Sequence, residues 1–182
     1  EGIKAVATRI AQLINRREAN GQKTVLSLAS GRSMRDLFVE LVRLHKEEGL
    51  SFKNVVVFGS YEFYPLSDAT SGSMAQIQSQ LLDHIDILPE NVHTFPGDLP
   101  KETIFTFCEE YEKAIEAVGG IDIQVLGIGQ CGNIAMNEPG TQPNSSTRLV
   151  IMDGNSRVDA KSLFGNIAQV PTCAITLGID TI

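Results

Sequence analysis

The chain lacks the features of a secreted or membrane-spanning protein. It has only three cysteines, Cys108, Cys131 and Cys173, and their odd number and wide spacing are typical of free thiols in a reducing compartment rather than of a disulfide framework. No apolar run approaches the roughly 18 residues that span a membrane, and Glu1 opens an amphipathic helix rather than a signal peptide. We therefore expect a cytoplasmic protein that does not act at a membrane.

Clustered positive charge is also missing. The net charge is -7 and the isoelectric point is near 4.9, and the lysines and arginines form no basic cluster. Because binding to a phosphate backbone needs a clustered basic face, this charge pattern argues against a nucleic-acid partner. We expect a small-molecule ligand instead, and we predict no metal site.

The length and the order of the expected elements predict the fold. At 182 residues and 42% hydrophobic content, the chain is long enough for one domain with a sizeable core and too short for two comfortable ones, so we predict a single α/β domain over residues 1–182. Strand-like and helical segments alternate, which predicts a three-layer, doubly wound, mostly parallel sheet with helices on both faces. The strands are expected at 24–28, 54–58, 92–94, 121–126, 148–151 and 172–176, and the helices at 3–17, 34–48, 73–84 and 102–118.

A glycine-rich segment follows the fourth predicted strand and invites a misleading interpretation. Residues 127–132 satisfy the pattern G-x-G-x-x-G, and Asp153 follows at about the twenty-residue offset at which a dinucleotide fold places its ribose-binding acid. That fold needs a return helix of at least roughly ten to twelve residues, whereas Pro139 and Pro143 stop this one too early. The sequence therefore predicts a turn and a short helical stretch from about Asn133, suited to a sugar phosphate, with no dinucleotide or other cofactor.

Three polar loops follow predicted strands, at the carboxyl ends where parallel sheets bind ligands. They span residues 29–33, 59–65 and 127–138. In the first loop, Ser30, Gly31, Arg32 and Ser33 lie between a strand and a helix, where backbone N–H groups, the helix dipole, two hydroxyls and a guanidinium favour a phosphate. A serine N-cap beside a turn glycine would explain the same residues without a ligand.

The second loop contains one carboxylate between aromatic side chains. Glu62 is flanked by Tyr61 and Phe63, and a glutamate in such surroundings can have a raised pKa and act as an acid or a base. The interpretation that the sequence favours is plainer. It is a solvated glutamate on a loop whose aromatic residues pack downward.

The third loop offers further polar candidates. Cys131, Asn133 and Glu138 alternate with small or apolar residues, so we expect them to face one pocket. Cys131 would need a base to act as a nucleophile, and no histidine lies near it in sequence, which favours a buried, inert thiol. The histidines fall in or beside predicted helices and are interpreted as structural or surface residues: His45, His84 and His93.

The three loops together resemble the glucosamine-6-phosphate deaminase family, which shares its fold with the 6-phosphogluconolactonases. The similar stretches run through nearly the whole chain in family order, at residues 41–46, 51–58, 82–87, 134–139, 146–148 and 169–171. The similarity is greatest to a bacterial subgroup whose deaminase-like domain is often joined to a deacetylase-like one. The resemblance implies conversion of glucosamine 6-phosphate to fructose 6-phosphate and ammonia, through an open-chain sugar and an enediol.

The resemblance also implies catalytic positions, and the sequence departs from the family at several of them. Tyr61 stands where the family has the aspartate base of an M-D-E-Y motif, and an unperturbed phenol, with a pKa near 10, is a poor base at neutral pH. Cys131 and Asn133 replace the aspartate and histidine of the family's ring-opening relay, and an asparagine cannot shuttle a proton. Glu138 is the relay residue that remains.

The phosphate-binding positions match the family in part. Residues 29–34 correspond to the family loop P-T-G-x-T-P and keep its hydroxyls and first glycine. The family's phosphate-clamping arginine falls at Ser162, with Lys161 beside it as a substitute. The family also uses an initial strand and, beyond Ile182, a further strand and helices with a phosphate-binding lysine, so we expect a chain truncated at both ends.

These departures leave three functions open. The first, which we favour, is an enzyme of the deaminase/isomerase class with impaired deamination. The second is a catalytically silent homologue that binds a sugar phosphate through residues 30–33 and Glu138. The third is an interaction domain that supports a fused partner enzyme or assembles as a homo-oligomer.

Overall fold

Two β-sheets form the centre of the molecule, and the computed structural model describes both of them along with every other residue from 1 to 182. Strands β4 (Val92–His93), β2 (Val55–Gly59), β1 (Thr24–Leu28) and β5 (Ile123–Val125) lie side by side in that order and are parallel. Strands β3 (Tyr61–Tyr64), β7 (Cys173–Thr176) and β6 (Arg148–Ile151) form a second, antiparallel sheet in that order. The predicted α/β class with a parallel sheet is confirmed, and the antiparallel sheet adds to it.

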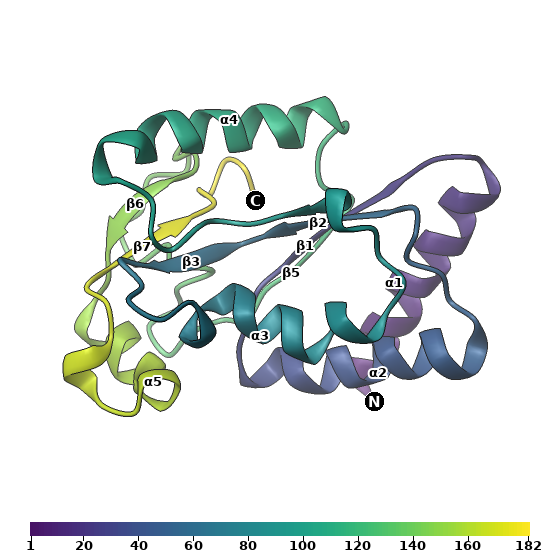
Figure 1. The fold of residues 1–182 in the computed structure, drawn as a ribbon, viewed down its shortest axis with the longest axis horizontal. Helices are drawn as coiled ribbons and strands as arrows, with labels where there is room; N and C mark the ends of the chain where they lie inside the picture. The colour runs from purple at the N-terminus through teal and green to yellow at the C-terminus, as the bar shows by residue number, and fades with distance from the viewer.

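Helices cover both faces of the parallel sheet. Helices α1 (Gly2–Ala19), α2 (Arg32–Glu48) and α3 (Ser73–Gln80) pack on one face, and α4 (Ile104–Ala117) packs on the other, as Figure 1 shows with α4 above the strands and α2 and α3 below them. Successive side chains of a strand point to opposite faces, so Val55 and Val57 contact the first group of helices while Val56 contacts α4. The three predicted layers are therefore present.

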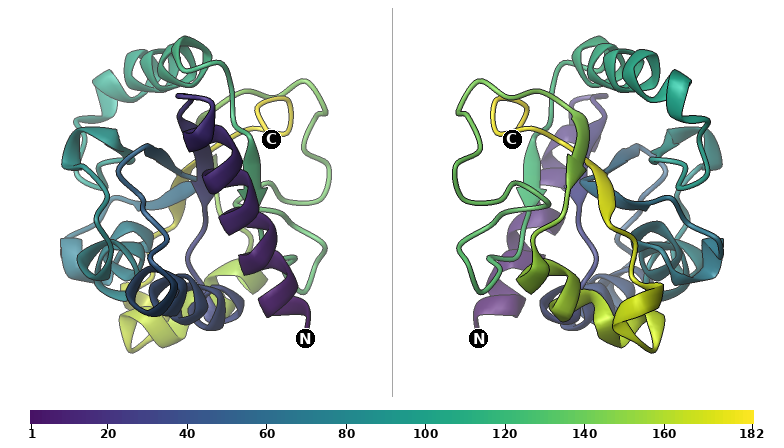
Figure 2. Two further views of the ribbon diagram at one scale, coloured as in Figure 1. Left: turned by 90° about the vertical axis from the view of Figure 1, so that its right-hand side faces the viewer. Right: turned by 90° about the vertical axis from the view of Figure 1, so that its left-hand side faces the viewer.

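Helix α5 (Gly154–Phe164) lies at one end of the molecule beside the antiparallel sheet (Figure 2). The sequence analysis did not predict it. Its boundaries nevertheless carry ordinary signals, because the Asp153 side chain accepts a hydrogen bond from the N–H of Asn155 at 2.8 Å and Gly165 follows its last residue. Ala160 of this helix packs against Met152 and Val170, which closes a small third core.

The chain passes almost directly from the parallel sheet into the antiparallel one. Only Ser60 separates β2 from β3. Its backbone bonds to one strand of each sheet: its N–H donates to Leu28 O of β1 at 2.9 Å, and its carbonyl accepts from Leu177 N, just after β7, at 3.0 Å. The polar loop predicted from residue 59 is therefore wrong over residues 61–64, which form β3. The strand is held by pairing with β7, a partner far along the chain.

The segment from 127 to 138 contains no helix, so the short helical stretch predicted from Asn133 is also wrong. Gly132 and Ala135 have φ values of 81° and 47°, in the left-handed region that a right-handed helix excludes. The turn is fixed instead by Asn137, whose Nδ2 donates to Leu177 O at 2.8 Å and to Ile134 O at 3.2 Å. No return helix lies between β5 and β6, in agreement with the early stop that the sequence predicted at Pro139 and Pro143.

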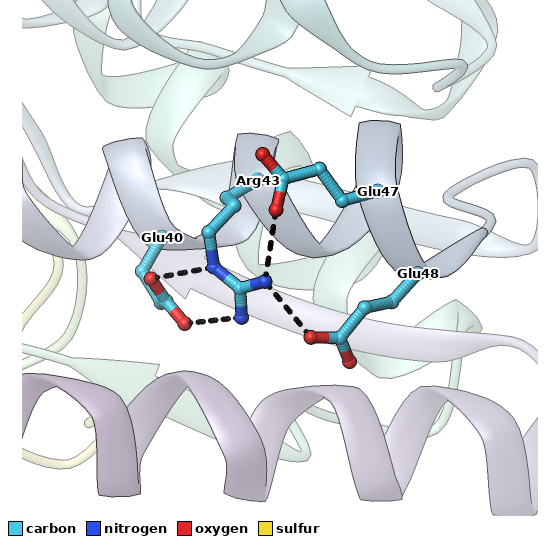
Figure 3. A network of polar contacts seen from close by, with 4 residues as sticks. All are labelled: Glu40, Arg43, Glu47 and Glu48. Atoms are coloured by element: carbon cyan, nitrogen blue, oxygen red, sulfur yellow. Dashed lines mark hydrogen bonds and ion pairs between the residues drawn. The ribbon is translucent and has the colours of Figure 1, made fainter.

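A network of charged side chains lies on the outer surface of α2 (Figure 3). The guanidinium of Arg43 donates to Glu40 at 2.7 and 3.1 Å, to Glu48 at 2.9 Å and to Glu47 at 3.2 Å. The hydrogen bonds with Glu40 raise the pKa of Arg43 and lower the pKa of Glu40.

None of the helices combines the length and the apolar character that crossing a membrane requires.

Candidate functional site

A cavity of about 480 Å³ opens where the three predicted loops meet. Ser30 reaches it from the end of β1, Tyr61 from β3 just beyond the end of β2, and Asn133 from the turn after β5. The sequence analysis placed these three side chains in one cleft because each follows a strand at its carboxyl end, and this placement is confirmed. Helices α3 and α5 supply the remaining walls.

The N-terminus of α2 faces the cavity with free donors. Its N-cap residue is Gly31, with φ 132°, and no side chain caps the helix, so the alternative of a serine N-cap is wrong. The backbone N–H groups of Arg32 and Ser33 donate to no other group of the protein. Unsatisfied N–H groups and the helix dipole together make this position suitable for an anion.

Tyr61 and Ser30 form a hydrogen-bonded pair in the cavity wall. The phenol oxygen lies 2.9 Å from Ser30 Oγ, and the ring of Tyr61 meets Phe63 edge to face with centroids 5.7 Å apart. Burial raises the pKa of Tyr61, and the hydrogen bond with Ser30 opposes that rise in part. A phenol whose pKa is raised further is a weaker candidate for a base at neutral pH than an ordinary tyrosine.

Glu62 occupies a different place from the one that the sequence suggested. It is 2% exposed, so the solvated-loop interpretation is wrong, and it does not line the cavity. In a strand alternate side chains face opposite sides, so Glu62 points toward α3 while its neighbours point into the cavity. Its carboxylate accepts from Ser73 N at 2.7 Å and from Phe63 N and Met74 N at 2.8 Å. Burial raises the pKa of Glu62, and these three N–H groups oppose the rise.

Of the three candidates in the loop after β5, only Asn133 lines the cavity. Cys131 is exposed, and its Sγ accepts from Asn155 Nδ2 at 3.4 Å, so the prediction of a buried thiol is wrong. Glu138 Oε1 accepts from Asp153 N at 3.2 Å, just before α5. The expectation that all three face one pocket fails because the left-handed residues of the turn break the alternation of side chains.

Helix α5 contributes one face to the cavity. Ser156, Asp159, Ala160 and Leu163 share the i, i+3, i+4, i+7 spacing of a single helical face, and Ser162 also lines the cavity. Lys161 lies off this face and is exposed, so the structure does not place it at the cavity as the predicted substitute for a phosphate clamp.

Several lining residues were not found from the sequence: Arg35, Gln76, Gln130, Ser156 and Asp159. Arg35 lies three residues after Arg32 of the predicted phosphate loop, close to one helical turn, and that spacing was a usable signal. The sequence carries no comparable signal for the lining residues of α5, because they share a face only once that segment is a helix. No histidine lines the cavity; His93 stacks on Phe58 with ring centroids 4.4 Å apart, and His84 is exposed, as expected of structural and surface residues.

Comparison with known proteins identifies relatives over the whole fold. Residues 1–161 match the family described as glucosamine-6-phosphate isomerases/6-phosphogluconolactonase. The chain is 48% identical to a glucosamine-6-phosphate deaminase-like protein of Bacteroides thetaiotaomicron, which matches 100% of this chain, while the chain spans only 28% of that protein. It is 41% identical to the glucosamine-6-phosphate deaminase of Bacillus pumilus, over 94% of this chain and 71% of that enzyme.

A solved structure agrees with this relationship. The chain superposes on a monomeric glucosamine-6-phosphate deaminase with a TM-score of 0.91 and 33% sequence identity, over 99% of this chain and 73% of that one. This likeness extends the sequence match to the three-dimensional arrangement of both sheets.

Proposed function

The chain belongs to the glucosamine-6-phosphate isomerase/6-phosphogluconolactonase family, and from that premise we propose that its cavity binds a sugar phosphate and supports a deaminase-like reaction on an amino-sugar phosphate. The observation that carries the proposal is the meeting of Ser30, Tyr61 and Asn133 in one cavity beside the free N-terminus of α2. We take residues 1–182 as a single domain of this kind.

The phosphate end of the proposed ligand lies at residues 30–33. The N–H groups of Arg32 and Ser33 have no partner in the protein, and Arg32 lines the cavity with its positive charge. A phosphate group would satisfy these donors and favour the helix dipole. Sugar hydroxyls would meet the neutral side chains of Tyr61 and Asn133.

The reacting end of the cavity is weak in proton-transfer groups, and we propose that deamination is slow. The Tyr61 phenol has a raised pKa, Asn133 cannot relay a proton, and Glu138 lies outside the cavity lining with one oxygen hydrogen-bonded to Asp153 N. Losing a general base or acid typically removes a factor of about 10²–10⁴ in rate.

Ammonia release from glucosamine 6-phosphate tests this proposal. We expect wild-type turnover below the usual enzyme range of about 1–10³ s⁻¹, and an increase in the variant that combines Tyr61→Asp with Asn133→His. Adding Cys131→Asp should change the rate less, since Cys131 lies outside the cavity lining. Wild-type turnover within that range would contradict slow deamination.

A catalytically silent sugar-phosphate-binding domain, or an interaction domain beside a partner enzyme, is the alternative function. The raised pKa of the Tyr61 phenol favours this alternative, because it leaves the cavity without a good base. The chain also spans only 28% of the Bacteroides relative. Calorimetric titration with glucosamine 6-phosphate and with inorganic phosphate separates the two forms. Binding that weakens in Arg32→Ala with Ser33→Ala supports a ligand site, whereas no binding at millimolar concentration leaves only the interaction domain.

A further inference from the structure

Three charged side chains line the cavity, and they differ in sign. Arg32 and Arg35 come from α2, and Asp159 comes from α5; the other lining residues are neutral. The cavity therefore carries positive charge on one wall and a single carboxylate on another, in a chain whose overall charge is -7.

The two arginines form one positive wall. They are three residues apart on α2, a spacing that places side chains on the same side of a helix. The ion pairs of the chain involve other residues, and neither guanidinium donates a hydrogen bond within the protein. Together with the first N–H groups of α2, they are suited to one anionic group of a ligand.

Asp159 is held on a separate wall. Its Oδ1 accepts a hydrogen bond from Gln130 Nε2 at 3.0 Å, and Gln130 belongs to the same loop as Asn133. This contact fixes the carboxylate on the side of the loop after β5, and it forms no ion pair with either arginine. The protein thus keeps opposite charges apart within one cavity rather than neutralising them.

We propose that Asp159 is the residue that distinguishes amino-sugar phosphates from neutral sugar phosphates, by pairing with the protonated amine while Arg32 and Arg35 hold the phosphate. The inference rests on the proposed function, because it assigns the ligand's second charge within the same cavity. A ligand with an ammonium and a phosphate complements both walls, whereas one with a hydroxyl in place of the amine leaves the carboxylate without a counter-charge. Asp159 is exposed, and water screens its charge, so the gain for the amine is modest, at most about fivefold in affinity.

Calorimetric titration with glucosamine 6-phosphate and glucose 6-phosphate tests the assignment, since the two ligands differ only in the amine. The titration is made at pH 6.5, where an amine with a pKa near that of an α-amino group, about 7.7, is charged. Wild type should bind the amino sugar about fivefold more tightly. Asp159→Asn should bind both ligands equally, and Asp159→Lys should reverse the preference. Asp98→Asn removes the same charge from an exposed loop outside the cavity and should keep the wild-type preference.

The outcomes separate this inference from the proposed function. Equal binding of the two sugars by wild type, or a preference that persists in Asp159→Asn and Asp159→Lys, overturns the role of Asp159 while the sugar-phosphate site stands. Failure of wild type to bind either sugar phosphate overturns the proposed function and this inference with it. Circular dichroism of each variant establishes that the fold is kept.

Discussion

At the scale of single residues, Glu62 joins β3 to α3 through a buried carboxylate. Both of its oxygens accept backbone N–H groups, two of which belong to the first residues of α3. Those N–H groups are donors that a helix cannot satisfy internally. The neighbouring Tyr61 therefore owes its place in the cavity wall to a strand that is anchored from its other face.

Replacing Glu62 with glutamine should destabilise the protein by about 1–3 kcal/mol at pH 7, since one carboxylate oxygen becomes an NH₂ group that faces an N–H donor. Urea unfolding measures the change. Glu109→Gln, on the exposed face of α4, is the matched control and should leave the midpoint unchanged. Equal stabilities of the two variants would show that the Glu62 contacts contribute nothing.

The same variant has a defined pH dependence. Burial raises the pKa of Glu62 in the folded state above its ordinary value of 4.5, so ionising this carboxyl lowers the free energy of unfolding. The part of its contribution that is linked to protonation is fully present below that value and is lost as pH rises through the folded pKa. The stability difference between wild type and Glu62→Gln should therefore be larger at pH 4 than at pH 7. A difference that grows with pH would reverse the assigned sign.

At the scale of elements, the two ends of α2 differ in what surrounds them. The N-terminus has free N–H groups at the cavity, while Arg43 near the C-terminus contacts three glutamates on the surface (Figure 3). Surface ion pairs contribute little because water and salt screen them and long side chains lose freedom in forming them. The network is thus a feature of the helix surface rather than a support of the site.

Arg43→Ala should lower the thermal midpoint by at most about 2 °C, in spite of its four hydrogen bonds. Differential scanning calorimetry in low salt and in 1 M salt checks this, and the small difference should shrink at high salt. A loss as large as that of Glu62→Gln would mean that the network acts cooperatively.

The elements that were predicted correctly carry local signals, and those that were missed depend on distant partners. β1 and β2 are runs of buried, mostly β-branched or aliphatic residues, and α2 shows helical periodicity with Gly49 at its end. β3 has only four residues and is fixed by pairing with β7. The placement of Ser30 and Tyr61 was predictable because each closely follows the end of β1 or β2, which carry such local signals. The burial of Glu62 and the position of Asp159 depend on the packing of α3 and α5 and were not predictable.

At the scale of the whole molecule, contacts from the last residues of the chain hold the two sheets together. Glu112 of α4 accepts from Thr147 N at 2.7 Å and from Thr181 Oγ1 at 2.6 Å, which ties α4 to the start of β6 and to the segment after β7. Gly178 lies against Ser145, and a Cβ added to Gly178 would stand 1.9 Å from the backbone oxygen of Ser145. The backbone approach at this point leaves no room for a side chain.

Gly178→Ala should therefore destabilise the fold by about 1–3 kcal/mol, because the backbone itself must move to admit the methyl group. Urea unfolding at neutral pH measures the loss. Gly2→Ala, where an added Cβ meets nothing within 4 Å, is the control and should be neutral or slightly stabilising. A tolerated Gly178→Ala would show that the two segments separate easily.

The pairing of β3 with β7 sets an order of events during synthesis. Residues 61–64 leave the ribosome long before residues 173–176, with which they pair, so a nascent chain carries a strand without its neighbour. Phe63, 1% exposed in the fold, is then uncovered beside unpaired backbone groups. An unpaired strand edge with an exposed apolar side chain is prone to aggregate and is a target for chaperones. The cavity wall that carries Tyr61 is completed only when translation has passed Thr176.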